Sequence, residues 1–150
     1  MKKEGKRAPI EMSGEFLNTI REWQKLEDET VRISGETMSK SDNPIVKMLM
    51  EMIRHDSEKH KVMLRLLEEG ITKEQLHLSP DELSPLADML HKHIEAESNS
   101  VRMAQQALEQ SELFITRYVL TMLLADEAKH HRLLGDLNEI MLKRATIFVT

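Results

Sequence analysis

Cysteine is absent from the 150-residue chain. Its absence excludes disulfide bonds, iron–sulfur clusters held by protein thiolates, rubredoxin-type iron centres, thiolate zinc sites and catalysis by a thiol. Histidine, aspartate and glutamate are the metal-binding side chains that remain.

Long apolar runs and charge of one dominant sign are also absent. Nowhere do eighteen apolar residues follow one another, and the basic first nine residues lead into no apolar segment of signal-peptide length. The formal net charge is -5, with acidic and basic residues mixed along the chain, so no basic stripe indicates binding to nucleic acid or to an anionic membrane. We expect a soluble cytoplasmic protein with neither nucleic acid nor membrane among its partners.

Aromatic residues, glycine and proline are scarce. The chain has 3% aromatic residues, five Gly and four Pro, and its β-branched residues never alternate with polar ones over the length of a strand. Apolar residues instead recur at three- and four-residue spacing, which predicts an all-α protein. At this length we expect one domain, covering residues 1–150, with one core.

Four long helices are expected, in two hairpins over about residues 10–69 and 85–143. In the first hairpin the helices should run over 10–39 and 44–69, with Pro44 at a first helical position and Gly70 ending the second helix.

A connection over residues 70–84 joins the hairpins. It contains two pairs with the spacing of a capping box, each of which could start a helical turn: Thr72 with Gln75, and Ser79 with Glu82. The third helix is expected to begin near Pro85, and the fourth to follow Ser111.

Polar residues interrupt the apolar stripe of every predicted helix near its middle. The first and third helices each place one acid there, Glu27 and Glu97. The second and fourth helices each place three polar residues there. They are Asp56, Ser57 and His60 in the second helix, and Asp126, Glu127 and His130 in the fourth.

The second hairpin repeats the first. A shift of seventy residues aligns twelve identical pairs between 27–69 and 97–139 without a gap, whereas composition alone predicts about three or four. The identical pairs include Glu27 with Glu97, Asp56 with Asp126, and His60 with His130. We therefore predict an ancient duplication, with two hairpins packed in approximate two-fold symmetry.

Such packing would bring the interior acids and imidazoles together. Glu127 and His130 are three residues apart, so their side chains lie on one helix face. Carboxylates buried in an apolar core without partners cost several kcal/mol each, so a divalent cation is expected among them. A buried Asp with a His four residues later can also be a neutral hydrogen-bonded core pair, as Asp56 with His60 could be.

The pattern resembles the ferritin-like di-iron carboxylate proteins, and among them the small rubrerythrin-like four-helix bundles. The resemblance covers about residues 16–141. The family site takes one Glu from each of two helices and a Glu-x-x-His from each of the other two. The resemblance therefore implies five metal ligands: Glu27, His60, Glu97, Glu127 and His130.

Other polar residues lie around the expected ligands. Asp56 and Asp126 stand where family members use an Asp to orient a histidine across the bundle. His93 lies one turn before Glu97. It is expected either to serve as an extra ligand or pocket acid–base group, or to line the bundle without contacting metal.

Ser57 departs from the family pattern, because it stands where a second Glu-x-x-His would have its Glu. A neutral hydroxyl is a poor ligand for iron or manganese. Three outcomes stay open: two ions with water or substrate replacing the absent carboxylate, one ion, or none. Iron is the expected metal, with manganese or zinc as alternatives.

Two classes of function follow. The first is a ferroxidase- or peroxidase-type oxidoreductase in which Fe(II) reduces dioxygen or peroxide. Its electrons would come from an external donor, because the chain has no cysteine-based electron-transfer domain. The alternative is a non-catalytic helical bundle for binding or scaffolding, with a degenerate metal site. The apolar C-terminal residues 147–149 need covering, either by the bundle itself or by a neighbouring subunit, and the second alternative implies a homodimer.

Overall fold

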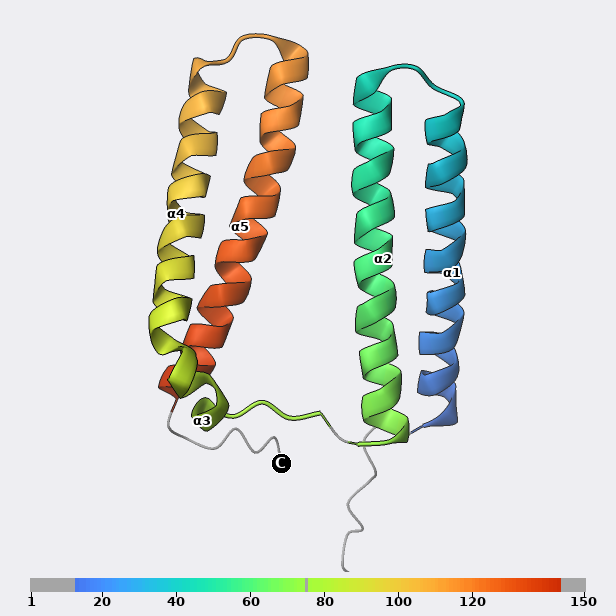
Figure 1. Ribbon diagram of the computed structural model, residues 1–150, viewed down its shortest axis with the longest axis vertical. Helices are drawn as coiled ribbons and strands as arrows, with labels where there is room; N and C mark the ends of the chain where they lie inside the picture. The colour runs from blue at the N-terminus through green and yellow to red at the C-terminus, as the bar shows by residue number, and fades with distance from the viewer. Residues whose placement is uncertain (1–12, 75, 144–150) are drawn as a thin grey trace, which may run out of the picture. The chain divides into compact units, whose positions relative to one another are not determined.

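The computed structural model describes residues 13–74 and 76–143, and within them the chain is all-helical with no β-strand, as the sequence predicts. The chain divides into two compact units, with the boundary between Leu76 and His77. Each unit contains one helical hairpin (Figure 1). None of the helices in the described part of the chain is long and apolar enough to cross a membrane.

The first unit pairs α1 (Gly14–Ser39) with α2 (Pro44–Thr72). The side chain of Ser13 caps α1 by accepting a hydrogen bond of 3.0 Å from a backbone N–H three residues later. The side chain of Asn43 caps α2 in the same way, with Pro44 following at the first helical position. Side-chain caps of this kind satisfy backbone donors that have no partner inside the helix.

Two of the expected boundaries in this unit are wrong. The first helix begins at Gly14 rather than at residue 10, and residues 10–12 lie outside the described part. The second helix continues through Gly70 to Thr72 instead of stopping at residue 69.

Gly70 is helical, and no described glycine has a positive φ. A Cβ atom at Gly70 would lie 2.7 Å from Cγ of Leu76. Glycine therefore leaves room for the chain to pack back over the end of α2, rather than ending the helix in a left-handed conformation.

Thr72 does not start a helical turn, because it is the last residue of α2 and its hydroxyl donates to the carbonyl of Glu68 at 2.8 Å. Gln75, its expected capping partner, lies outside the described residues. The other capping pair is present: the backbone N–H of Ser79 donates to Glu82 Oε2 at 2.6 Å, as the spacing predicts.

The second unit begins with the short helix α3 (Pro80–Leu83) and the 3₁₀ turn η2 (Ser84–Leu86), followed by the hairpin of α4 (Ala87–Gln110) and α5 (Phe114–Leu142). Pro85 therefore lies in a 3₁₀ turn, two residues before the helix it was expected to begin. The prolines of this segment each stand at the start of a turn, where a missing N–H is tolerated.

Helix positions in the two units share the seventy-residue offset of the sequence repeat. Helices α2 and α5 are both 29 residues long and begin seventy residues apart. Ile20 on α1 and Leu90 on α4, also seventy residues apart, are both buried. An origin by duplication remains a prediction.

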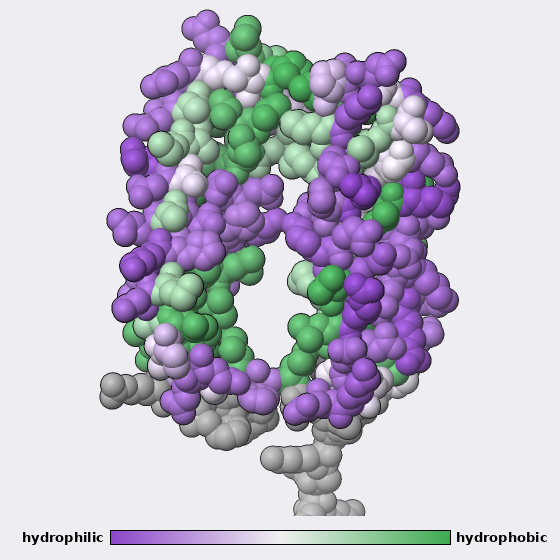
Figure 2. Space-filling model, in the orientation of Figure 1, coloured by the Kyte–Doolittle hydropathy of each residue, from purple (hydrophilic) through white to green (hydrophobic). Residues whose placement is uncertain are grey.

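The apolar core of each hairpin is thin. The buried apolar residues are Ile20 and Leu64 in the first unit, and Leu83 and Leu90 in the second. Many larger apolar side chains stay exposed, and Figure 2 shows apolar residues on each hairpin above and below a hydrophilic stretch near mid-length. Helices gain most of their stability from packing an apolar face, so each hairpin still has apolar surface to cover.

Candidate metal centre

Three predicted ligands come together in the second unit. Glu97 lies near the middle of α4, and Glu127 and His130 near the middle of α5. One potential ligand atom from each lies within 4.8 Å of the others. We call Glu97, Glu127 and His130 the hairpin-two cluster.

Local helix geometry explains why these side chains meet. Glu97 follows the buried Leu90 by seven residues, two helical turns, so it lies on the face of α4 that packs against α5. Glu127 and His130 are three residues apart and share one face of α5. Helical spacing thus brings two carboxyl groups and an imidazole together between α4 and α5.

The imidazole of His130 lies beyond hydrogen-bond distance of both carboxyl groups of the hairpin-two cluster. His130 Nδ1 lies 3.7 Å from Glu97 Oε2 and 3.9 Å from Glu127 Oε2. Ligand atoms around a transition metal sit about 2.0–2.2 Å from the ion, which separates them from one another by about 3–4 Å. The spacing therefore fits a cation.

The electrostatics of the cluster also fit a cation. The side chain of Glu97 is only 14% exposed, and its Oε2 atom is buried without a hydrogen-bond partner. A hydrogen bond with the carboxyl group of Glu97 is the largest cause that raises the pKa of Glu127. Burial and the charge of Glu97 raise this pKa further, whereas His130 lowers it. The neighbouring carboxyl group thus disfavours ionisation of Glu127, and a metal ion bound there would favour it.

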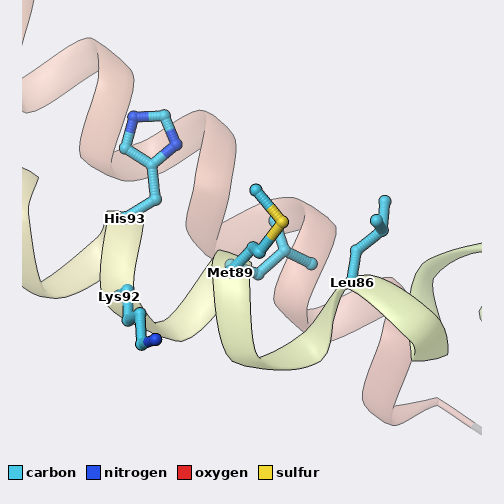
Figure 3. Close-up of a pocket in the computed structure, with 5 residues that line it drawn as sticks. Leu86, Met89, Lys92 and His93 are labelled. Atoms are coloured by element: carbon cyan, nitrogen blue, oxygen red, sulfur yellow. The ribbon is translucent and has the colours of Figure 1, made fainter.

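His93 contacts the other oxygen of Glu97. Its Nε2 atom lies 3.5 Å from Glu97 Oε1, whereas His130 faces Oε2. His93 and Met89 line an apolar pocket. Figure 3 shows their side chains on one side of α4 and the side chain of Lys92 on the other. His93 is thus close to the cluster but is not one of its three convergent groups.

The first unit holds a different cluster. Glu27 of α1 faces Ser57 and His60 of α2, and His60 Nδ1 lies 3.2 Å from Glu27 Oε1. The indole Nε1–H of Trp23 donates to the same oxygen at 2.8 Å. Ser57 also hydrogen-bonds to the carboxylate. We call Trp23, Glu27, Ser57 and His60 the hairpin-one cluster.

Hydrogen bonds satisfy the buried carboxylate of the hairpin-one cluster. Glu27 is 8% exposed and Ser57 4%. Burial, the largest single cause, acts to raise the pKa of Glu27, but hydrogen bonds from Ser57 and Trp23 and the interaction with His60 together lower it below its usual value. The carboxylate is therefore held ionised by donors of the protein itself.

The five predicted ligands thus divide into two from the first unit and three from the second. The contact of Trp23 was not predicted, although its position four residues before Glu27 is a signal, since residues at that spacing share a helix face. His93 stands in the same relation to Glu97.

The two aspartates each form an ion pair with a lysine of their own helix. Asp56 pairs with Lys59 at 2.5 Å and Asp126 with Lys129 at 3.1 Å, each within its own helix. Their expected role in orienting a histidine remains a prediction.

Comparisons of the chain with protein-family models, with curated proteins and with solved structures found no match. The resemblance to ferritin-like proteins therefore rests on the residues and their spacing.

Proposed function

We propose that this protein is a ferritin-like metal protein that binds a divalent ion through Glu97, Glu127 and His130. The observation that carries the proposal is the buried Oε2 atom of Glu97, which lacks a hydrogen-bond partner beside a second carboxyl group and an imidazole. An unsatisfied buried carboxylate oxygen is costly, and a cation bound there would satisfy it.

The proposed fold is a four-helix bundle formed by the two hairpins. Exposed apolar side chains on both hairpins support it, because each hairpin needs an apolar surface to cover its own. The equal lengths of α2 and α5 and their seventy-residue offset support two related halves. The bundle is the arrangement of the rubrerythrin-like proteins that the sequence resembles.

The mixed carboxylate and imidazole donors suit iron, manganese or zinc. When iron is bound, it would supply electron transfer to dioxygen or peroxide. Glu97 and Glu127 would offset the charge of the ion, and metal binding would favour the ionised form of Glu127. His130 would bind through Nδ1, the ring nitrogen that faces both carboxyl groups.

Metal titration of matched variants tests this function. Calorimetry with Mn²⁺ or Zn²⁺ on the metal-free chain should give weaker binding by about tenfold or more for Glu97→Gln, since it removes a ligand. Glu95→Gln, an exposed acid on the same helix, should bind like the wild type. Equal affinity for Glu97→Gln and wild type would refute the assigned site.

A non-catalytic bundle for binding or scaffolding is the second candidate. It is favoured by one observation: the carboxylate of Glu27 is already satisfied by donors of the protein. Anaerobic loading with Fe(II) followed by exposure to oxygen separates the candidates. Iron oxidation faster than in buffer, and slowed by Glu97→Gln, supports the oxidoreductase; iron that binds and oxidises no faster supports the non-catalytic bundle.

A further inference from the structure

We propose that Trp23 and Ser57 close the hairpin-one cluster to metal, so that each chain binds one ion, held by the hairpin-two cluster. The inference rests on the proposed metal binding of the second unit. It differs from the two-ion site that the family resemblance implies, in which Glu27 and His60 would also be ligands.

The two hairpins differ at two of the four related positions in and beside the clusters. Under the seventy-residue shift, Glu27 and His60 correspond to the identical Glu97 and His130. Ser57 corresponds to Glu127, and Trp23 to His93. In both cases the first unit has a hydrogen-bond donor where the second has a carboxylate or an imidazole. An indole nitrogen donates only, and a neutral hydroxyl is a poor ligand for these metals.

The geometry of the hairpin-one cluster is that of a completed hydrogen-bond network. Trp23 Nε1 and His60 Nδ1 lie 2.8 and 3.2 Å from the same oxygen of Glu27. The corresponding contacts of Glu97, from His93 and His130, are 3.5 and 3.7 Å. Donors therefore lie close around Glu27, whereas the two imidazoles near Glu97 stand at longer distances.

Metal binding at Glu27 would disrupt this network. The ion would displace the indole hydrogen bond and remove the partner of Ser57, which is 4% exposed. One carboxylate would then face a divalent charge, whereas the second unit offers two. Hydrogen bonds to an ionised group are stronger than those between neutral groups, so an ion that binds Glu27 would have to offset their loss. The role of this hydrogen-bond network is to join α1 to α2.

The related variants Glu27→Gln and Glu97→Gln provide the test. Calorimetry of the full chain with Zn²⁺ should find about one ion per wild-type chain and affinity within about twofold for Glu27→Gln, but a loss of about tenfold or more for Glu97→Gln. Two ions per wild-type chain, or equal losses in both variants, would overturn the inference and leave the proposed metal binding standing. A wild type that binds no Zn²⁺ would overturn both.

Trp23 offers a second measurement that needs no variant, because it is the only tryptophan of the chain. Zn²⁺ has a filled d shell and no redox chemistry, so it should not quench the indole by electron transfer. The emission maximum should stay constant while calorimetry records binding. A spectral shift that follows the binding curve would mean that the ion disturbs the Trp23–Glu27 hydrogen bond, and would overturn the inference even if Glu27→Gln does not fold.

Discussion

Replacing Ser57 with Glu would give the hairpin-one cluster the acid that Glu127 provides in the other unit. Ser57 is 4% exposed, and its side chain hydrogen-bonds to the buried carboxylate of Glu27. The variant removes this hydrogen bond and places a second carboxyl group beside the first. The pKa of the new Glu should rise for the same reason that the pKa of Glu127 does.

The size of the effect follows from these two changes. Loss of a hydrogen bond to an ionised group destabilises by about 1.5 kcal/mol, and a second carboxyl group beside it should cost about as much again, which gives a total of about 3 kcal/mol. For a chain of this size the Tm should fall by about 6–12 °C. The control Ser57→Ala loses only the hydrogen bond, so its Tm should fall by about half as much.

Thermal unfolding followed by circular dichroism, with chelator and then with metal, measures both effects. An ion at one hundred times its Kd stabilises by about 2.7 kcal/mol, so a second ion in Ser57→Glu should recover most of the lost Tm. Ser57→Ala should gain no more from metal than the wild type. A Ser57→Glu protein that is as stable as wild type in chelator, or gains nothing extra from metal, would refute the reasoning.

Three further predictions concern the second cluster and the end of α2. Because Glu97 and burial raise the pKa of Glu127, the folded state favours the protonated form of this residue, and stability is lost as the pH rises through that pKa. Glu127→Gln should therefore raise the Tm of the metal-free protein at pH 7 by about 2–4 °C, measured by calorimetry. An unchanged or lower Tm would count against the close acid pair. Zn²⁺ affinity should fall by up to about tenfold per pH unit as acidification protonates Glu127, and affinity independent of pH would exclude this carboxylate as a ligand. Gly70→Ala should stabilise the protein by about 0.5–1 kcal/mol in a Leu76→Ala background. In the wild type it should stabilise by less, because a Cβ atom at this position would lie 2.7 Å from Cγ of Leu76. Equal effects in the two backgrounds, measured by urea unfolding, would show that Leu76 does not restrict this position.

The helices were largely predictable because their periodicity and caps are local signals. Asn43 and Pro44 mark the start of α2, and the end of α1 at Ser39 is where the pattern stops. The end of α2 was predicted too early, because Gly70 is needed for contact with Leu76. That contact involves the chain beyond the helix, so the helical pattern does not contain it.

The candidate site was predictable in its acids and histidines but not in its hydrogen bonds. Glu97, Glu127 and His130 interrupt apolar stripes, and that interruption identified them. The donation from Trp23 to Glu27 was not predicted, because a tryptophan on an apolar stripe indicates core packing. Whether a buried carboxylate is satisfied depends on distances across a hairpin, which spacing along one helix does not specify.

Elemental analysis is the most direct test of the central claim, which is that Glu97, Glu127 and His130 bind a metal ion. The full chain would be purified after growth with added iron, manganese and zinc, beside its Glu97→Gln variant. The wild type should carry about one transition-metal ion per chain and the variant far less. Metal below about a tenth of an ion per wild-type chain, or equal content in both proteins, would contradict the claim.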